Sequence, residues 1–292
     1  MKLGIIGGSG VYEIEGLQNV HHESPQTPFG EPSDAYCCAE QDGVELIFLP
    51  RHGREHRIMP SEINHRANIY GFKALGCDCV LSISAVGSLK ETMHPRDIVL
   101  PDQYYDRTKK SFEHTFFGNG VVAHVSVADP TCPSLRDVMA QTAREVIAAE
   151  GLPHAVHVGG TYVNMEGPAF STRAESNAYR SHGFDVIGMT SLGEAKLCRE
   201  AEICYQPMAM VTDYDCWHAE AGNVTVEMVI GHLVANTKLA KAIVVALATR
   251  IRDERACSCR SAMQNAILTP AASLRDGDRD RLGLILARHL DG

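Results

Sequence analysis

The 292-residue sequence has no apolar run that approaches the ~18 residues needed for a membrane-spanning helix. It also lacks basic blocks: 27 Lys and Arg stand against 36 Asp and Glu, which gives a net charge of −9. Such a chain is a poor partner for nucleic acid or an anionic membrane surface. The start, Met1–Gly8, is too short and too early in glycine for a signal peptide, so we expect a cytoplasmic protein.

The ten cysteines include no Cys-x-x-Cys motif, which argues against a zinc site and predicts no bound metal. Two Cys-x-Cys pairs are present instead. Cys77 and Cys79 open an expected buried strand, where small thiols are common packing residues. Cys257 and Cys259 lie in a charged segment, and in an extended chain their Cα atoms would be ~6.5 Å apart, near the upper limit for a disulfide. We expect free thiols there, either redox-active or idle.

Apolar residues make up 45% of the chain, and apolar runs alternate with helical patterns. This alternation predicts an α/β fold, a single domain with a central mixed β-sheet flanked by helices. The expected strands are Leu3–Ile6, Val44–Leu49, Cys79–Ser84, Asp97–Leu100, His157–Val163, Asp185–Gly188 and Met208–Val211. The expected helices are Ser61–Leu75, Ser134–Glu150, Thr172–Ser181, Val224–Ile251 and, shorter, Glu194–Glu202. We assign residues 1–251 to this domain and 252–292 to a C-terminal tail packed on it or extending it, with an amphipathic piece at Leu282–Leu290.

Three expected strands end in groups that can bind an anion. The first leads into Gly7-Gly8-Ser9-Gly10, whose amides could converge on a phosphate, although the loop is neither a dinucleotide fingerprint nor a Walker loop. The second leads into Arg51 and His52, a guanidinium that could grip phosphate in bidentate fashion and an imidazole that adds a donor. The third ends at Ser84–Ser88, with a hydroxyl and unshielded amides. Singly, each could be a turn or a polar loop; together they predict one phosphate site.

Two carboxylates, Asp213 and Asp215, follow the apolar run Met208–Val211. Alternate residues of an extended segment point the same way, so both acids should face one site at the carboxyl edge of the sheet, where ligands bind. Repulsion between the two charges should raise at least one pKa. A neutral acid can then donate to a ring nitrogen while an ionised neighbour accepts from an exocyclic amine, which suits the N7/N6 edge of adenine.

The segment 164–175 turns from a strand end into a helix. Thr172 and Glu175 have the spacing of a capping box. Capping does not explain two other residues of the segment. Glu166 could accept hydrogen bonds from a ribose diol, and Phe170 could cover the face of a base.

Six segments carry a resemblance to a known family by their residues and by their order along the chain: Gly7–Gly10, Arg51–Gly53, Ser84–Ser88, Met165–Pro168, Asp185–Thr190 and Thr212–Trp217. Together they resemble the trimeric purine nucleoside phosphorylase family, and within it the S-methyl-5′-thioadenosine phosphorylases, from Lys2 to about Leu247. The resemblance implies phosphate-dependent cleavage of S-methyl-5′-thioadenosine to adenine and 5-methylthioribose 1-phosphate, as in methionine and purine salvage. It implies inorganic phosphate as co-substrate and no metal or organic cofactor.

The resemblance also implies roles for individual residues. The phosphate-binding positions are Ser9, Arg51, His52, Ser84, Ala85 and Thr190. The nucleoside positions are Phe170, Ser171, Met189 (at the ribose) and the catalytic acids Asp213 and Asp215. The apolar wall around the 5′-methylthio group is formed by Val226, Val229 and Ile230. His124 matches a residue that a neighbouring subunit lends to the pocket. The family's site therefore exists only in an oligomer, a homotrimer or a hexamer.

Three positions depart from the family pattern: Ser9 stands where Thr is common, Gly193 replaces a usual Pro and His65 replaces a frequent Tyr. Two alternative functions stay open. One is a phosphorylase for methylthioinosine or other 6-oxopurine nucleosides, which two carboxylates disfavour because a 6-oxo group accepts rather than donates. The other is a nucleoside-binding protein without catalysis on the same fold.

Overall fold

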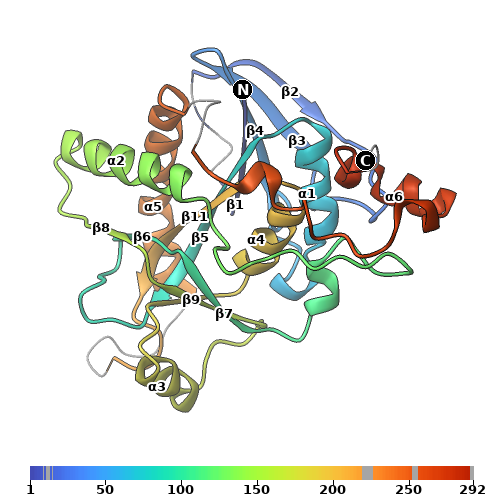
Figure 1. Ribbon diagram of the computed structural model, residues 1–292. Helices are drawn as coiled ribbons and strands as arrows, with labels where there is room; N and C mark the ends of the chain where they lie inside the picture. Colours follow the sequence, from blue (N-terminus) through green and yellow to red (C-terminus); the bar gives the residue numbers. More distant parts are fainter. Residues whose placement is uncertain (9, 11–13, 15, 219–225, 252–255, 290–292) are drawn as a thin grey trace.

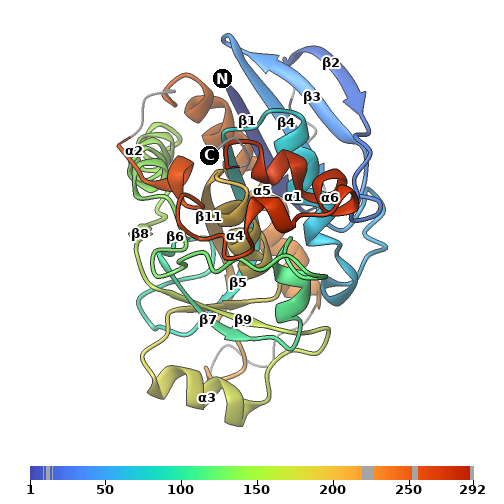
Figure 2. The same cartoon turned by 45° about the vertical axis from the view of Figure 1, so that its right-hand side comes forward.

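The computed structural model of the chain describes residues 1–8, 10, 14, 16–218, 226–251 and 256–289 (Figure 1). It shows helices on both faces of a large mixed β-sheet, which confirms the predicted fold class (Figures 1 and 2). The helices are α1 (His65–Ala74), α2 (Pro133–Ala149), α3 (Arg173–Ser181), α4 (Ser191–Glu200), α5 (Val226–Ala248) and α6 (Asp276–Leu286).

The sheet contains eleven strands in the described part of the chain. They are β1 (Lys2–Gly7), β2 (Gln18–Glu23), β3 (Tyr36–Gln41), β4 (Val44–Pro50), β5 (Cys79–Ser88), β6 (Ile98–Leu100), β7 (Gln103–Arg107), β8 (Val156–Val158), β9 (Thr161–Met165), β10 (Val186–Gly188) and β11 (Cys204–Asp213). The order is β2-β3-β4-β1-β5-β10-β9-β7, and β11 pairs with both β5 and β6. Because β1, β4, β5 and β11 are linked by parallel pairings, their carboxyl ends meet at one edge of the sheet.

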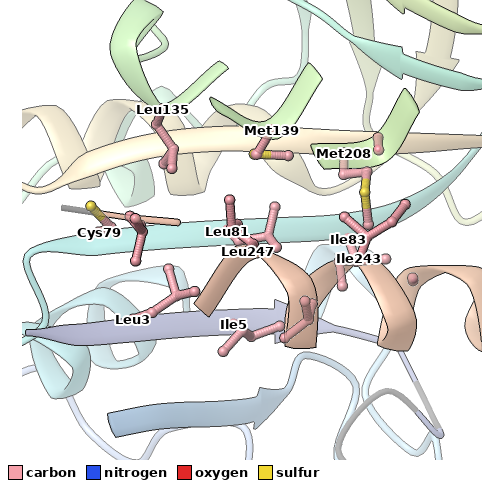
Figure 3. Close-up of a cluster of buried hydrophobic side chains, with 14 of the residues drawn as sticks. Leu3, Ile5, Cys79, Leu81, Ile83, Leu135, Met139, Met208, Ile243 and Leu247 are labelled. Atoms are coloured by element: carbon pink, nitrogen blue, oxygen red, sulfur yellow. The ribbon is translucent and has the colours of Figure 1, made fainter. Parts of the chain in front are cut away.

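Alternation of side chains along the central strands builds two apolar layers. Ile5 belongs to the cluster that packs against α2 and α5, whereas its neighbour Ile6 belongs to the cluster beneath α1, α4 and α6. Figure 3 shows the first cluster, in which Leu81 of β5 lies among side chains that include Met139 of α2 and Leu247 of α5. Burial of the central strands on both faces explains why they were recognisable as continuous apolar runs.

Several predicted boundaries were wrong for local reasons. The single strand expected at His157–Val163 is two strands, β8 and β9, because Gly159 and Gly160 adopt φ values of 87° and 109° between them. Helix α1 begins at His65 rather than Ser61, since a 3₁₀ turn precedes it and the Asn64 side chain caps it by accepting from the Ala67 amide. Helix α4 begins before Glu194, at Ser191.

Other local predictions were confirmed. Thr172 and Glu175 form the expected capping box at the start of α3. The strands that the sequence missed, β2, β3 and β7, lie in the outer part of the sheet. Every residue of β2 is exposed, so this strand carries no apolar periodicity from which it could have been recognised.

The described part of the C-terminal tail ends in α6, which starts earlier than the amphipathic piece expected at Leu282–Leu290. Leu282 and Ile285 of α6 are buried in the same apolar cluster as Ile69 and Phe72 of α1. The tail helix therefore packs on the sheet face that α1 covers (Figure 2). Among the described helices, none combines the length and the hydropathy that a membrane span requires.

Candidate active site

A cavity of about 270 Å³ opens where the carboxyl ends of the strands meet. Its volume is near the lower end of the range for small-molecule sites, roughly 300–1,000 Å³. Most of the predicted site residues line it: Arg51, His52, Ser84, Ala85, Phe170, Met189, Thr190, Asp213 and Asp215. The structure thus brings together side chains from five separate stretches of sequence.

Six predicted residues are not placed on the wall of this cavity. Ser9 lies outside the described residues, and Val226, Val229 and Ile230 start α5 with side chains that are not described. His124 is exposed, and its backbone amide donates to the Ala266 carbonyl in the tail. Ser171 does not line the cavity, but its hydroxyl lies 3.9 Å from Sδ of Met165, which does.

Arg51 is 2% exposed and directs its guanidinium toward Glu194 of α4. Nε donates to Glu194 Oε1 at 2.5 Å, and Nη2 donates to Oε2 at 3.3 Å and to Ser82 Oγ at 2.7 Å. Burial opposes ionisation of Glu194, but the Arg51 charge prevails and lowers the pKa of this carboxyl. The bidentate fork predicted to grip phosphate is therefore occupied by Glu194. Nη1, which donates to the Ile83 carbonyl, keeps a second hydrogen for a ligand.

His52 is a neutral imidazole at physiological pH. Burial, together with the nearby Arg51 charge, lowers its pKa to about 4. Nδ1 lies 2.8 Å from the Ile58 carbonyl oxygen, which can only accept, so Nδ1 carries the hydrogen. Nε2 is then an acceptor. The sequence predicted a donor here, but as folded His52 is suited to accept a hydrogen bond from a protonated phosphate oxygen.

Two further groups favour an anion on this side of the cavity. The Ser84 hydroxyl is buried with no hydrogen-bond partner among the described residues. Thr190 is the N-cap of α4, so the positive end of that helix dipole lies at the cavity wall. Both features leave donors available to a bound phosphate.

Asp213 and Asp215 also line the cavity and are 8% and 5% exposed. They reach it by a different route from the one predicted. Strand β11 shifts register between Val211 and Asp213, and Asp215 adopts a left-handed backbone with φ of 52° in the turn that follows. The Asp215 amide donates to Asp213 Oδ1 at 2.7 Å, which ties the two residues together.

The pKa values of both acids are raised, as the sequence predicted for at least one of them, but burial is the largest cause. Repulsion by Asp213 adds to the shift of Asp215. The Thr212 hydroxyl lies 3.2 Å from the Val86 carbonyl oxygen and 2.8 Å from Asp213 Oδ2. The Thr212 hydroxyl donates to Asp213 Oδ2, which favours the ionised acid, but burial outweighs this contact and the pKa of Asp213 is raised. Asp215 Oδ2 is buried without a hydrogen-bond partner among the described residues.

Gly87 allows Asp213 to sit where it does. A Cβ at this position would lie 3.0 Å from Asp213 Oδ1 and 3.1 Å from Ile187 Cγ2. A side chain at this position would force Asp213 or Ile187 to shift by a few tenths of an ångström, so the glycine serves close approach rather than an unusual backbone angle.

The two unusual residues, His65 and Gly193, meet at one place beside the cavity. A Cβ on Gly193 would lie 2.8 Å from His114 Cδ2 and 3.0 Å from His65 Cδ2, because the two imidazoles pack edge to face with centroids 5.8 Å apart. A proline ring at this position would collide with both. The glycine therefore accommodates the histidine pair, which explains both departures together.

The sequence also missed residues that shape the cavity. Glu194 was predicted only as the start of a helix, yet its exposed fraction is 0% and it holds Arg51. Asn236 and Thr237 of α5 line the cavity too. A carboxylate among apolar neighbours such as Leu192 and Ala195 was the available signal for Glu194, because an unpaired charge is not stable in such surroundings. The α5 residues carried no comparable signal.

A family model described as the phosphorylase superfamily matches residues 2–249. The chain belongs to this superfamily. An S-methyl-5′-thioadenosine phosphorylase of Geobacter sulfurreducens is 51% identical over 288 residues, and one of Thermosynechococcus vestitus is 53% identical over 291; each alignment covers 99% of both chains.

Solved structures agree with this assignment. A methylthioadenosine phosphorylase from an antarctic soil metagenomic library superposes with a TM-score of 0.92 at 43% identity, over 97% of this chain and 98% of the other. A methylthioadenosine phosphorylase from Schistosoma mansoni in complex with adenine gives a TM-score of 0.83 at 34% identity, over 92% and 99% of the two chains. The mixed sheet flanked by helices is thus the fold of these phosphorylases.

Proposed function

We propose that this protein cleaves S-methyl-5′-thioadenosine with phosphate, releasing adenine and 5-methylthioribose 1-phosphate. The names of its relatives support this assignment, and one observation on the chain itself carries it. Two buried carboxylates with raised pKa values, Asp213 and Asp215, share one cavity with the anion-binding groups around Arg51 and Ser84. This arrangement suits a 6-aminopurine on one side and phosphate on the other.

The reaction breaks the bond between C1′ and N9 and forms a bond between C1′ and a phosphate oxygen. Positive charge develops on the ribose ring and negative charge on the departing base. The phosphate stabilises the first charge and then attacks C1′, while Asp213 stabilises the second by giving its proton to N7. Asp215 Oδ2, which has no hydrogen-bond partner among the described residues, accepts from the 6-amino group.

The phosphate lies against the opposite wall. Arg51 Nη1, the Ser84 hydroxyl, the Ala85 amide, Thr190 and Ser9 supply donors, and His52 Nε2 accepts from a protonated phosphate oxygen. Glu194 acts through Arg51 as a positioning residue, because it fixes the guanidinium plane. Holding both reactants in one orientation lowers the entropic part of the barrier.

The remaining contacts belong to the nucleoside. Phe170 covers the base, Ser171 lies with the two acids around the base, and Met189 lies at the ribose. The 5′-methylthio group contacts Val226, Val229 and Ile230, and His124 of a neighbouring copy completes this wall in a homotrimer. The exposure of His124 in its own chain supports that role.

The broader assignments follow from the same reaction. We assign residues 1–251 to the catalytic domain and 252–292 to a tail on the same domain. Nucleoside and phosphate are the partners, without nucleic acid or membrane. The reaction uses no organic cofactor and no catalytic metal, and we place it in the cytoplasm.

A turnover assay tests the proposal. Purified protein is incubated with S-methyl-5′-thioadenosine, with and without phosphate, and adenine and the sugar phosphate are quantified. We expect both products in equal amounts, and none without phosphate. Methylthioinosine serves as the comparison substrate. A preference for methylthioinosine, or adenine release that does not need phosphate, would contradict the proposal.

A further inference from the structure

Four cysteines from three separate parts of the sequence meet at the amino end of β11. Cys204 is the first residue of that strand, Cys132 is the N-cap of α2, and Cys257 and Cys259 come from the tail. The four sulfur atoms all lie within 4.8 Å of one another. Cys132, Cys204 and Cys259 are buried and Cys257 is partly buried. All ten cysteines lie within the described ranges, and none forms a disulfide there.

We propose that Cys132, Cys204, Cys257 and Cys259 form a tetrathiolate site for Zn²⁺. Zinc prefers four ligands in a tetrahedron, and sites of four cysteines are closed structural sites. With Zn–S bonds of ~2.3 Å, the edges of a sulfur tetrahedron are roughly 3.8 Å long. The Cys204 and Cys257 sulfur atoms are 3.5 Å apart, and the 4.8 Å limit holds for the other pairs. The cluster therefore already has the size of a zinc site, and small side-chain rotations would complete it.

The surroundings of the cluster fit a site of net negative charge. Four thiolates and one Zn²⁺ carry a charge of −2, which a buried site tolerates only with nearby positive groups. Arg199 Nη1 donates to Cys259 Sγ at 3.7 Å. Cys132 is at the amino end of α2, where the helix dipole favours a thiolate. These two features provide an outer shell for the metal.

An ion could also reach the cluster. A cavity of about 170 Å³ lies beside it, lined by residues that include Asp102, Asp129, Arg199, Ser258 and Cys259. Arg136 and Arg199 balance the charges of the two carboxylates in this lining, so the cavity is an electrically neutral path to the cluster, and partly exposed Cys257 offers a first ligand. Binding releases the thiol protons, so we expect the affinity for zinc to rise with pH.

Such a site would connect the tail to the core without touching the chemistry. Two ligands come from core elements and two from the tail, so the metal would join them as a crosslink. Cys204 and Asp213 are at opposite ends of β11, roughly 30 Å apart. Zinc should therefore raise thermal stability and leave kcat for the phosphorylase reaction unchanged.

The test uses the full-length protein, purified under reductant and stripped of metal by a chelator. Zn²⁺ is titrated with a competing chromophoric chelator, and Co²⁺ is added separately as a spectroscopic probe. We expect one metal ion per chain, thiolate-to-cobalt charge-transfer bands with the intense d–d bands of a tetrahedral site, and a higher Tm with zinc.

Three variants locate the site. Removal of a ligand in Cys257→Ser should weaken zinc binding by more than the roughly 10–100-fold that is typical of outer-shell changes, whereas Arg199→Gln should fall within that range. Cys77→Ser is the matched control, because Cys77 and Cys79 have the same spacing but lie outside the cluster; it should bind zinc like the wild type.

Three outcomes would overturn the proposal. One is a wild-type protein that shows no tetrathiolate cobalt spectrum, and this result needs no variant. Another is a Cys257→Ser variant that binds zinc as tightly as wild type. The third is a disulfide among the four cysteines that persists under reductant and leaves no affinity for zinc. None of these outcomes alters the turnover assay, so failure of the zinc site is distinguishable from failure of the proposed reaction.

Discussion

Every residue of β11 is buried, but its two ends differ in where the neighbouring polar and thiol groups come from in the sequence. At the carboxyl end, Asp213 and Asp215 are two residues apart in the sequence, and that spacing predicted that both would face one site. At the amino end, Cys204 contacts three cysteines from distant segments, and no spacing in the sequence predicted this cluster. The acid pair was predictable because its residues lie on one segment, whereas the cysteines come from segments with no common sequence pattern and are brought together only by the fold.

The largest expected effect is at the carboxyl end. Asp213→Ala removes the proton donor to N7, so kcat should fall by roughly 10²–10⁴-fold, the range for loss of a general acid. Asp213→Asn keeps a donor without an acid and should lie between wild type and Ala. The measurement is steady-state kcat and KM with S-methyl-5′-thioadenosine. If zinc affinity fell along with kcat, the two ends would not be independent; full activity of Asp213→Ala would refute its assigned role.

Glu194 contacts residues near both ends of β11. It accepts a hydrogen bond from Arg51 at the cavity and another from the hydroxyl of Tyr205, which is next to Cys204. Glu194→Gln leaves a buried guanidinium without its counter-charge, and we expect a loss of roughly 3–5 kcal/mol in the free energy of unfolding. The KM for phosphate should rise as Arg51 loses its orientation. Urea denaturation and phosphate kinetics measure the two effects.

Asp106→Asn is the matched control for Glu194→Gln. It breaks the more exposed pair between Asp106 and Lys196 of the same helix, and the loss should be only about 0–1 kcal/mol. If the two variants were equally stable, the pair between Arg51 and Glu194 would not hold the site as described.

A smaller, more selective effect is expected for Asp215→Asn. The ionised carboxylate accepts from a 6-amino group and repels a 6-oxo oxygen, whereas an amide can donate to that oxygen. We expect kcat/KM for S-methyl-5′-thioadenosine to fall by roughly 10-fold or more, with a relative gain for methylthioinosine. The ratio of kcat/KM for the two nucleosides measures the change. An unchanged ratio would show that Asp215 does not select the base.

The sequence predicted the layered fold and most of the cavity because both depend on local patterns. Strands such as β5 are continuous apolar runs, and Asp213 follows one of them directly. Glu194 was missed because its partner, Arg51, is far away in the sequence, and the orientation of the Arg51 fork follows from that contact. Edge strand β2 was missed because it buries nothing.

His65 provides the last prediction, which concerns how stability depends on pH. Burial lowers the pKa of His65 to about 3 from the ordinary value of 6.5. Below pH 6.5 His65 is protonated in the unfolded chain but stays neutral in the folded chain, so the free energy of unfolding decreases as the pH falls. Between pH 7.5 and pH 5 the loss should be about 2 kcal/mol.

Comparison with His65→Gln isolates this contribution. Glu200 acts in the opposite direction, because burial raises its pKa to about 7 and stability is lost as the pH rises through that region. His52, with its pKa of about 4, acts in the same direction as His65. Both contributions cancel in the difference between wild type and variant. Urea midpoints at pH 7.5 and pH 5 should show wild type losing more stability than the variant; equal losses would mean that His65 takes up its proton in the folded chain.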